Sequence, residues 1–416
     1  MVRRVPQPEF GLRLRRMRIE RGLSQRDLAV GSVNQSYISL LESGSRVPTL
    51  ETVVHLAGVL GVPLNTLVDD VPLHTDSPAV GSWLAEDVIT SSAIDHGDLE
   101  GAQTRLATTY RAALANGSAD KALHHGLGLE RILEMRGDQD GRYRLLTELV
   151  EMAVRVGVPE AAVRTRIALA SAARDVGRLA EALTQVEAAQ QEIDDSSFVN
   201  GPEHVRLLAV HTSVLSDAGG SIEVERIIER MLTMASQLGN RAIAGRAHWV
   251  ASVALARLGE VEKSLVHLQS AREMLANPST SLREWARFTR AAASALLDAE
   301  AGLAEIEPAM LAARAATAAS EAGDGPTVSV SLEVRYALAV GDPERALEIA
   351  STVDEETLTG IEKVRFVLAL GRAQRRCGRE EEAVATLSRA GQLAESAAAY
   401  RRAAQIWREV AGTARQ

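Results

Sequence analysis

The stretch LGRAQRRCGREEEAVATLSRA, residues 370–390, shows how most of this chain is built. Gly371, Ala383 and Ala390 are small residues of the kind that recurs where two helices pack closely, and Leu387 lies among them. Gly378 divides the stretch, and glycine is the residue that most often ends a helix. The stretch therefore predicts a hairpin of two closely packed helices.

This hairpin pattern recurs at regular intervals along the chain. Glycines or Gly-containing turns follow one another at steps of 37 to 43 residues, at positions 97, 137, 177, 219, 259, 302, 341 and 378. A period near 40 predicts hairpins with two helices of about sixteen residues each, and such hairpins bury their apolar faces only by stacking. We therefore expect a right-handed α-solenoid of about eight helical hairpins over residues 83–416.

The composition of the 416-residue chain favours an all-α fold throughout. Aromatic residues make up only 3% of it, so the core must consist of Ala, Leu and Val, which suits packed helices better than strands. The sequence has no run of eighteen apolar residues and no apparent signal peptide. Cys377 is the single cysteine, which fits a reducing cytoplasm. We therefore expect a cytoplasmic protein without a membrane partner.

The first 68 residues differ in charge from the rest of the chain. They hold nine arginines against five acidic residues, a net charge of +4, whereas the remainder carries −13. A basic head on an acidic body suggests a nucleic-acid-binding module joined to a second unit. Residues 69–82 contain two prolines and no helical period, and we expect them to be a linker. Cap and stop signals predict five short helices in the head, at residues 9–21, 25–30, 35–43, 50–60 and 63–67.

The head carries a set of short motifs in a fixed order. They are Arg21-Gly22-Leu23-Ser24-Gln25, Gln35-Ser36-Tyr37-Ile38-Ser39, Glu42-Ser43-Gly44 and Pro48-Thr49-Leu50. In this arrangement the head resembles the lambda-repressor-like, or Xre, helix-turn-helix family over about sixty residues. The resemblance implies a double-stranded DNA operator as partner, an ion pair between Arg18 and Glu42, and binding as a homodimer with the third helix in the major groove.

Side-chain chemistry suggests which residues of the head contact DNA. The Gln35 amide suits the edge of adenine, Ser36 and Ser39 suit either base, and Leu40 suits a thymine methyl group. Gln25 occupies a position where the family contacts phosphate through its amide. Arg46 follows the third helix, and we expect it to contact backbone phosphate. Asn34 caps the third helix and is counted with these residues.

The body resembles tetratricopeptide repeats, and HEAT-like hairpins are the alternative. Head and body together are similar to the RRNPP group of bacterial peptide-receptor regulators. That resemblance implies quorum sensing, with a signalling peptide bound in the concave groove of the repeats. The Asn side chains that usually clamp such a peptide are scarce in this body, which has only four.

Basic residues recur on the first helix of successive hairpins, thirteen residues before the turn glycine and again two turns later. We expect them to line the concave face as a site for an anionic ligand. Arg287 is included because it lies 41 residues after Arg246, although Thr289 is the residue found by counting from Gly302. The alternatives are a solvated arginine face arising from genome composition and, for Trp249, a place in the core. The predicted ligand-binding residues are His124, Arg131, Arg164, Arg206, Arg246, Trp249, Arg287, Arg335, Arg365 and Arg372.

These patterns predict a transcriptional regulator that is not an enzyme. The sequence has no P-loop, no GxGxxG or GxSxG motif and no metal-binding histidine motif, so we expect no cofactor and no metal. We expect the head to bind an operator, and the repeats to bind a signalling peptide or an anionic small-molecule effector and to mediate dimerisation. The alternative is a DNA-tethered interaction scaffold whose repeats recruit a partner protein.

Overall fold

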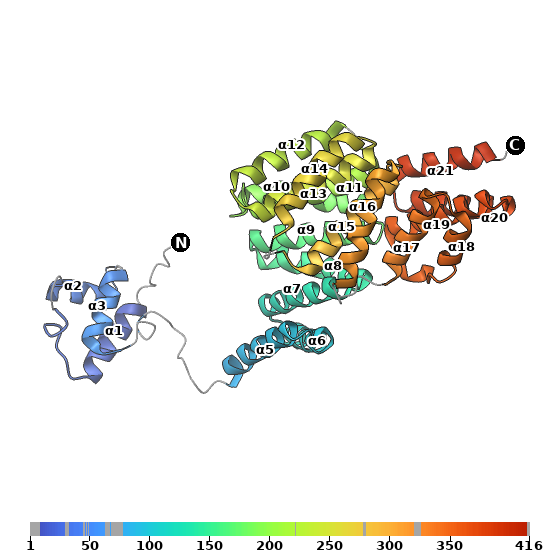
Figure 1. Ribbon diagram of the computed structural model, residues 1–416. Helices are drawn as coiled ribbons and strands as arrows, with labels where there is room; N and C mark the ends of the chain where they lie inside the picture. Colours follow the sequence, from blue (N-terminus) through green and yellow to red (C-terminus); the bar gives the residue numbers. More distant parts are fainter. Residues whose placement is uncertain are drawn as a thin grey trace. The chain divides into compact units, whose positions relative to one another are not determined.

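The computed structural model describes residues 9–29, 33–44, 46, 48, 50–62, 67, 78–220, 222–277, 280–319 and 326–413. All regular structure in these ranges is helical, as the composition predicted. The chain divides into two compact units, Met1–Val88 and Ile89–Gln416. Figure 1 shows the short helices of the head and the long series of body helices. No helix in the described ranges combines the length and the apolar character needed to cross a membrane.

Three described helices build the head: α1 (Glu9–Glu20), α2 (Gln35–Glu42) and α3 (Leu50–Leu60). Their inner faces form one core in which Leu14, Ile38 and Leu56 have no exposed surface. Gly11 lets α1 approach α2 closely, because a Cβ atom there would lie 2.2 Å from the carbonyl oxygen of Leu41. The third predicted helix therefore becomes α2, held firmly against α1.

The second predicted helix, over residues 25–30, does not form in the described part of that range. Residues 25–27 form a turn, with Asp27 N–H bonded to the carbonyl of Ser24 and Ala29 N–H to that of Arg26. Ser24 does act as a cap, but its own N–H and hydroxyl both donate to the Asp27 carboxylate, at 2.6 and 2.7 Å. This local pairing closes a single turn. Of the fifth predicted helix only Leu67, which is buried, lies among the described residues.

Part of the predicted linker is helical. Residues 69–77 of the predicted linker lie outside the described residues, but residues 78–82 belong to helix α5 (Pro78–Asp95). Proline is favoured in the first turn of a helix, so Pro78 opens α5 instead of marking a linker.

The remaining body helices alternate with short turns. Side-chain caps fix several starts: Asp138 accepts from Gly141 N–H, Asn240 from Ile243 N–H and Ser281 from Glu284 N–H. The helices are α6 (Leu99–Ala115), α7 (Ala119–Arg136), α8 (Gln139–Val156), α9 (Pro159–Asp175), α10 (Leu179–Glu192), α11 (Pro202–Ala218), α12 (Ile222–Gln237), α13 (Arg241–Leu258), α14 (Val261–Leu275), α15 (Leu282–Asp298), α16 (Leu303–Ala319), α17 (Pro326–Ala339), α18 (Pro343–Ala350), α19 (Gly360–Arg376), α20 (Glu380–Ser396) and α21 (Tyr400–Thr413).

Each helix from α6 onward packs against its sequence neighbour, so the predicted stack of hairpins is present in the described residues. One turn differs from the expected register. Between α15 and α16 the residue in the left-handed conformation is Glu300, with φ 50°, and not Gly302. The step from Gly259 is therefore 41 residues, and Arg287 is the true equivalent of Arg246.

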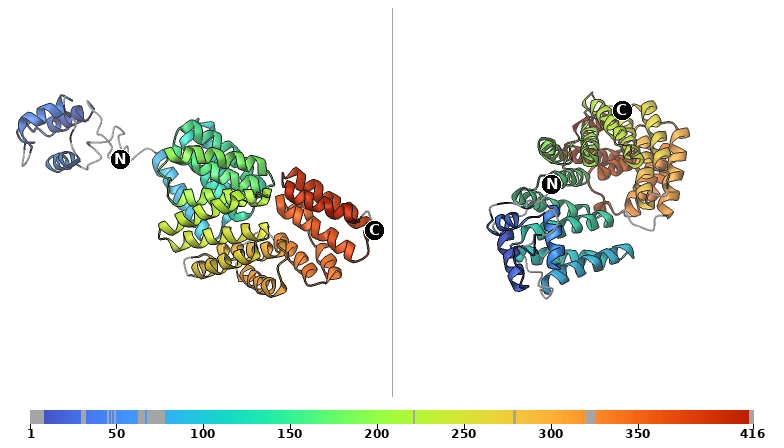
Figure 2. Two further views of the ribbon diagram at one scale, coloured as in Figure 1. Left: turned by 90° about the horizontal axis from the view of Figure 1, so that it is seen from above. Right: turned by 90° about the vertical axis from the view of Figure 1, so that its left-hand side faces the viewer.

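The stack of hairpins coils so that hairpins far apart in the sequence contact each other. The side chain of Arg287 on α15 lies 3.5 Å from Glu134 on α7, and Arg283 donates to the carbonyl of Met135. Farther along, the Thr359 hydroxyl before α19 donates to the carbonyl of Asp175 at the end of α9. Helix α21 packs on the end of α11. Two further views in Figure 2 show the late helices beside the earlier hairpins. The body is therefore closed on itself by contacts between its early and late repeats.

Candidate functional site

The exposed face of α2 is the candidate DNA-contacting surface. Gln35, Ser36, Ser39 and Leu40 are all exposed, whereas Ile38 and Leu41 are buried in the core. Exposed residues at positions one, two, five and six of a helix share one side of it. The structure thus brings the four predicted base-contacting residues together.

The side chains around α2 hold it in place. The Asn34 side chain accepts from Tyr37 N–H at 2.8 Å and caps the helix, as expected. Arg18 on α1 donates to both oxygens of Glu42, at 2.6 and 3.0 Å, so the expected ion pair is present. Although burial opposes it, hydrogen bonds from Arg18 and Gln25 keep the pKa of the Glu42 carboxyl below its usual value. This cluster fixes the end of α2 to α1.

Two predicted phosphate contacts are engaged within the head. The Gln25 amide is half-buried and donates to Glu42 at 2.8 Å, so it serves the Arg18–Glu42 pair. The Arg46 guanidinium is exposed and lies over the Tyr37 ring, 5.3 Å from its centre. Arg46 therefore presents a charge beside Tyr37 of α2.

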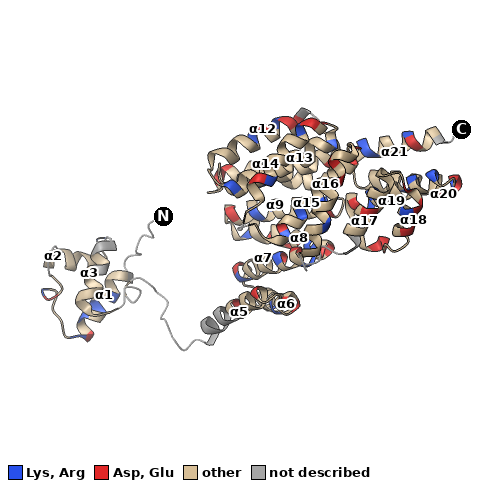
Figure 3. Ribbon diagram, in the orientation of Figure 1, with Lys and Arg blue, Asp and Glu red and all other residues tan. Residues whose placement is uncertain are grey.

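Several arginines of the predicted ladder in the body lie close to carboxylates. Arg246 is exposed and pairs with Glu284 on the next first helix, while Arg206 lies 3.5 Å from Glu203. His124, Arg131 and Arg164 are exposed on α7 and α9. Trp249 packs edge-to-face on Phe288, 5.6 Å between ring centres, which is the core placement. Basic and acidic residues are interspersed along the body helices (Figure 3). Because nearby carboxylates accompany several of these arginines, the ladder as a whole is not a row of free cations.

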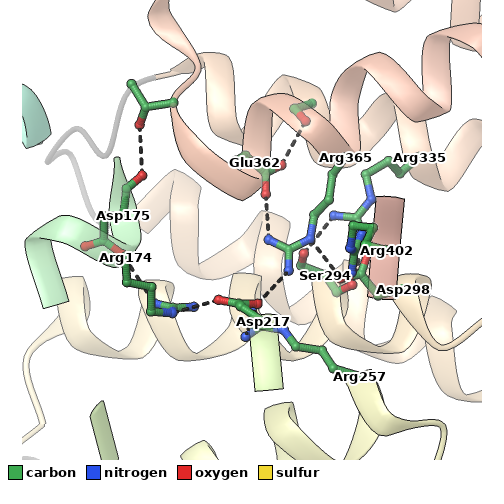
Figure 4. A network of polar contacts seen from close by, with 12 residues as sticks. Arg174, Asp175, Asp217, Arg257, Ser294, Asp298, Arg335, Glu362, Arg365 and Arg402 are labelled. Carbon is green, nitrogen blue, oxygen red and sulfur yellow. Dashed lines mark hydrogen bonds and ion pairs between the residues drawn. The ribbon is translucent and has the colours of Figure 1, made fainter. Parts of the chain in front are cut away.

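Three predicted ligand residues, Arg335, Arg365 and Arg372, do come together. Arg335 and Arg365 belong to an ionic network at the ends of the first helices, shown in Figure 4, whereas Arg372 pairs with Glu300 and Glu409. At its centre Asp298 accepts from Arg335 at 2.7 Å, from Arg365 at 2.8 Å and from Arg402 at 3.1 Å. One buried carboxylate thus joins α15, α17, α19 and α21.

A second buried carboxylate, Asp217 at the end of α11, completes the network. It lies 2.7 Å from Arg174, 2.9 Å from Arg257 and 3.8 Å from Arg365. Asp217 and Asp298 thus serve five guanidinium groups between them, with Asp175 and Glu362 at the edges. Despite burial, the surrounding arginines hold the pKa of both central carboxyls below the usual range, that of Asp298 well below it. Burial lowers the pKa of Arg257 to about 9, opposed by Asp217 and reinforced by Arg365.

The network borders a cavity of about 770 Å³. Seven arginines line it, at positions 257, 335, 365, 372, 376, 401 and 402, against two acidic residues, Asp298 and Glu300. Apolar side chains such as Leu297, Leu338 and Ile406 form the rest of the wall. A ligand cavity in proteins commonly has a volume of about 300–1,000 Å³, so this one is of ligand size. Its arginines make it a cationic cavity.

Sequence reasoning missed most of this site, although a signal for it exists. Asp175, Asp217, Arg257 and Arg376 each stand two residues before a turn glycine, and Asp298 stands two residues before Glu300. Charged residues at one repeat position predict a stacked polar row. The contribution of α21 carries no such signal, because it follows the last full hairpin.

A helix-turn-helix family model matches residues 14–67. The transcriptional regulator DdrOP3 of Deinococcus deserti is 38% identical over 68 residues, 16% of this chain and 53% of its own length. The cryptic phage CTXphi transcriptional repressor RstR of Vibrio cholerae is also 38% identical over 68 residues and is covered to 61%. The similar region therefore spans only about half of these relatives.

Two solved structures are similar to more of the chain, at low identity. Bacillus thuringiensis PlcR, in complex with the peptide PapR7 and DNA, is 14% identical, with 80% of this chain and 99% of PlcR covered and a TM-score of 0.41. A Rap protein complexed with competence and sporulation factor is 13% identical over 98% of this chain and 100% of its own, with a TM-score of 0.27. Residues 14–67, which include α2, α3 and most of α1, thus match the helix-turn-helix family.

Proposed function

We propose that the protein is a transcriptional regulator that binds operator DNA through its head and responds to an effector bound by its body. The exposed face of α2 is the observation that supports this best. Its four polar and apolar residues are exposed, and among the described residues neither an ion pair nor a core contact uses their side chains. A short helix rigidly mounted with such a face suits the major groove.

The regulators similar to the head support DNA binding as the activity of this domain. The body of stacked hairpins suits effector binding. We also assign dimerisation to it, because a single head buries too little DNA surface for useful specificity. A signalling peptide and an anionic small molecule are the two classes of effector that the sequence favours. In this proposal the protein acts in the cytoplasm and catalyses no reaction.

Selection of bound sequences from random double-stranded oligonucleotides tests the proposal with the full-length protein. We expect enrichment of a two-fold symmetric site whose half-sites lie about one helical turn apart, as for a dimer. Failure to enrich any sequence at low salt would contradict the proposal.

Gln35→Ala then tests the face of α2. It should weaken binding to the selected site by about 1–3 kcal/mol, the range for a bidentate base contact, and leave binding to random DNA almost unchanged. The matched control is Gln392→Ala, an exposed glutamine on α20. Equal losses on both DNAs would show that Gln35 does not contact a base.

A further inference from the structure

The cationic cavity is built for more negative charge than the protein supplies. Seven arginines against two acidic residues line it. The nearest carboxylates are already shared: Asp298 serves three guanidiniums and Asp217 another three, with Arg365 common to both. Burying guanidinium groups without equal countercharge is costly, so an anion that enters this cavity is favoured.

Individual nitrogen atoms of these arginines also lack hydrogen-bond acceptors. The Arg257 side chain is more than nine-tenths buried, and its Nε has no hydrogen-bond partner among the described residues. The same holds for Nη2 of Arg365, which lies 3.8 Å from an Asp217 oxygen. Both residues line the cavity. Buried N–H groups nearly always find an acceptor, and an anion in the cavity would provide one.

Two arginines in the outer part of the cavity make few polar contacts with the described residues. Arg401 on α21 has no ion pair or hydrogen bond with any described residue, and Arg376 uses only Nη1, on the carbonyl of Leu338. Arg372 is paired with Glu409 and Glu300. The cavity thus offers anion-binding groups both at its buried wall and at its rim, from different helices.

The remaining wall is apolar and belongs to the same helices. Leu258, Leu297, Leu338, Leu368 and Ile406 surround the arginines. An inorganic ion alone would leave this part of the cavity unused. The arrangement suits a molecule with adjacent anionic groups at one end and an apolar or planar portion at the other.

We propose that the cationic cavity binds a small organic polyanion, one that carries at least two adjacent phosphate or carboxylate groups on an apolar or planar body. This inference rests on the proposed function only where it identifies the ligand as the effector of the regulator. Planar guanidinium groups bind either kind of anionic group through paired hydrogen bonds. A bound polyanion would connect α21 with the ends of α13, α17 and α19, and so reinforce the closure of the body.

Calorimetric titration of the full-length protein tests the site. The ligands are adenosine triphosphate, tripolyphosphate and citrate, with adenosine as the uncharged counterpart. We expect binding of adenosine triphosphate that is tighter than that of tripolyphosphate and that weakens as salt is added, and no binding of adenosine. Binding of citrate in place of the phosphates would identify carboxylates as the anionic groups. Absence of binding by all three anions at millimolar concentrations would overturn the proposal.

A pair of variants on α21 shows whether the cavity is the site. Arg401→Gln removes a rim cation but keeps the stem that packs on Gly219, so the fold is preserved. We expect it to weaken binding of the anion about tenfold. Arg408→Gln, also exposed on α21 but outside the cavity, is the matched control and should bind as the native protein does. Equal binding by both variants would overturn the assignment to this cavity.

Measurements of DNA affinity distinguish a failure of this inference from a failure of the proposed function. The affinity for the selected operator is measured with and without the anion that binds, in native protein and in Arg401→Gln. A change in operator affinity that Arg401→Gln reduces supports the cavity as the effector site. Binding of the anion with unchanged operator affinity would overturn its role as the effector, while the DNA-binding activity proposed for the head would stand.

Discussion

At the scale of single residues, Gly177 and Gly360 approach each other closely where early and late repeats meet. Gly360 has φ 53°, and a Cβ atom there would lie 2.4 Å from the carbonyl oxygen of Asp175. A Cβ atom on Gly177 would lie 2.9 Å from Cα of Gly360. No side chain fits between α9 and α19 at this point.

Gly360→Ala should therefore destabilise the body more than an ordinary turn substitution does. Gly259→Ala is the control, because Gly259 also has positive φ but open space around it. We expect the control to lose about 1–2 kcal/mol, the cost of left-handed backbone in an L-residue, and Gly360→Ala to lose clearly more. Urea unfolding followed by circular dichroism measures both. Equal losses would show that α9 and α19 separate without cost.

Asp298→Asn is expected to be a severe change, because three guanidinium groups depend on one carboxylate. Removing one partner of a buried ionic cluster costs about 3–5 kcal/mol. Asp140→Asn, at an exposed position, should stay within about 0.5 kcal/mol of the native protein. Thermal unfolding of the two variants gives the comparison. If Asp298→Asn unfolds like the control, the network is not a source of stability.

Residue contacts that belong to a known sequence motif could be predicted, and contacts that depend only on the three-dimensional arrangement could not. The Arg18–Glu42 pair followed from the family pattern, and Asn34 from the capping rule. The Gln25 amide was expected on DNA, but its hydrogen bond to Glu42 depends on how α1, the turn at residues 25–27 and α2 meet in space. Such an arrangement has no signature in the local sequence.

At the scale of elements, α2 depends strongly on its cap because it has only eight residues. Asn34→Ala removes the bond to Tyr37 N–H and should cost about 1 kcal/mol of head stability. Because the whole helix is loosened, binding to operator and to random DNA should fall together. Asn34→Ser keeps a capping oxygen and should restore most of the loss, as measured by thermal unfolding and DNA titration. Selective loss of operator binding would instead give Asn34 a role in base recognition.

The sequence was most informative about helices whose ends are marked by turn glycines. Turn glycines located the body hairpins, and the one displaced turn arose because Glu300 adopts positive φ two residues before Gly302. The prediction of a helix at residues 25–30 was wrong, because Ser24 and Asp27 form hydrogen bonds with each other that close a single turn. Propensity and caps indicate where a helix can start, but they do not show how far it continues.

At the scale of the whole molecule, the ionic network links the stability of the body to pH. The pKa values of Asp217 and Asp298 are lowered on folding, so these groups stabilise the folded protein above the unfolded pKa, about 4. That contribution should be complete near neutral pH and should be lost as the pH falls below about 4 toward the folded pKa values. Unfolding midpoints measured between neutral and acidic pH test this. Asp298→Asn should show a weaker acid dependence, and an unchanged profile would contradict the role of Asp298.

The repeated hairpins were visible in the sequence, but their closure was not. Arg287 and Glu134 are separated by 153 residues, and Arg402 and Asp298 by 104. Which of these residues meet depends on the small rotation that each hairpin adds, summed over the stack. The charged row before the turns was readable in principle, but the cavity required the three-dimensional winding.

Closure also has a consequence for how this body can evolve. An open array of repeats gains or loses whole units readily, since each touches only its neighbours. Here Gly360 must reach Gly177 and Arg402 must reach Asp298. Deleting or duplicating one repeat length, for example residues 219–258, would displace every later contact by one unit. Homologues that keep this cavity should therefore keep the same number of hairpins, with length variation confined to loops.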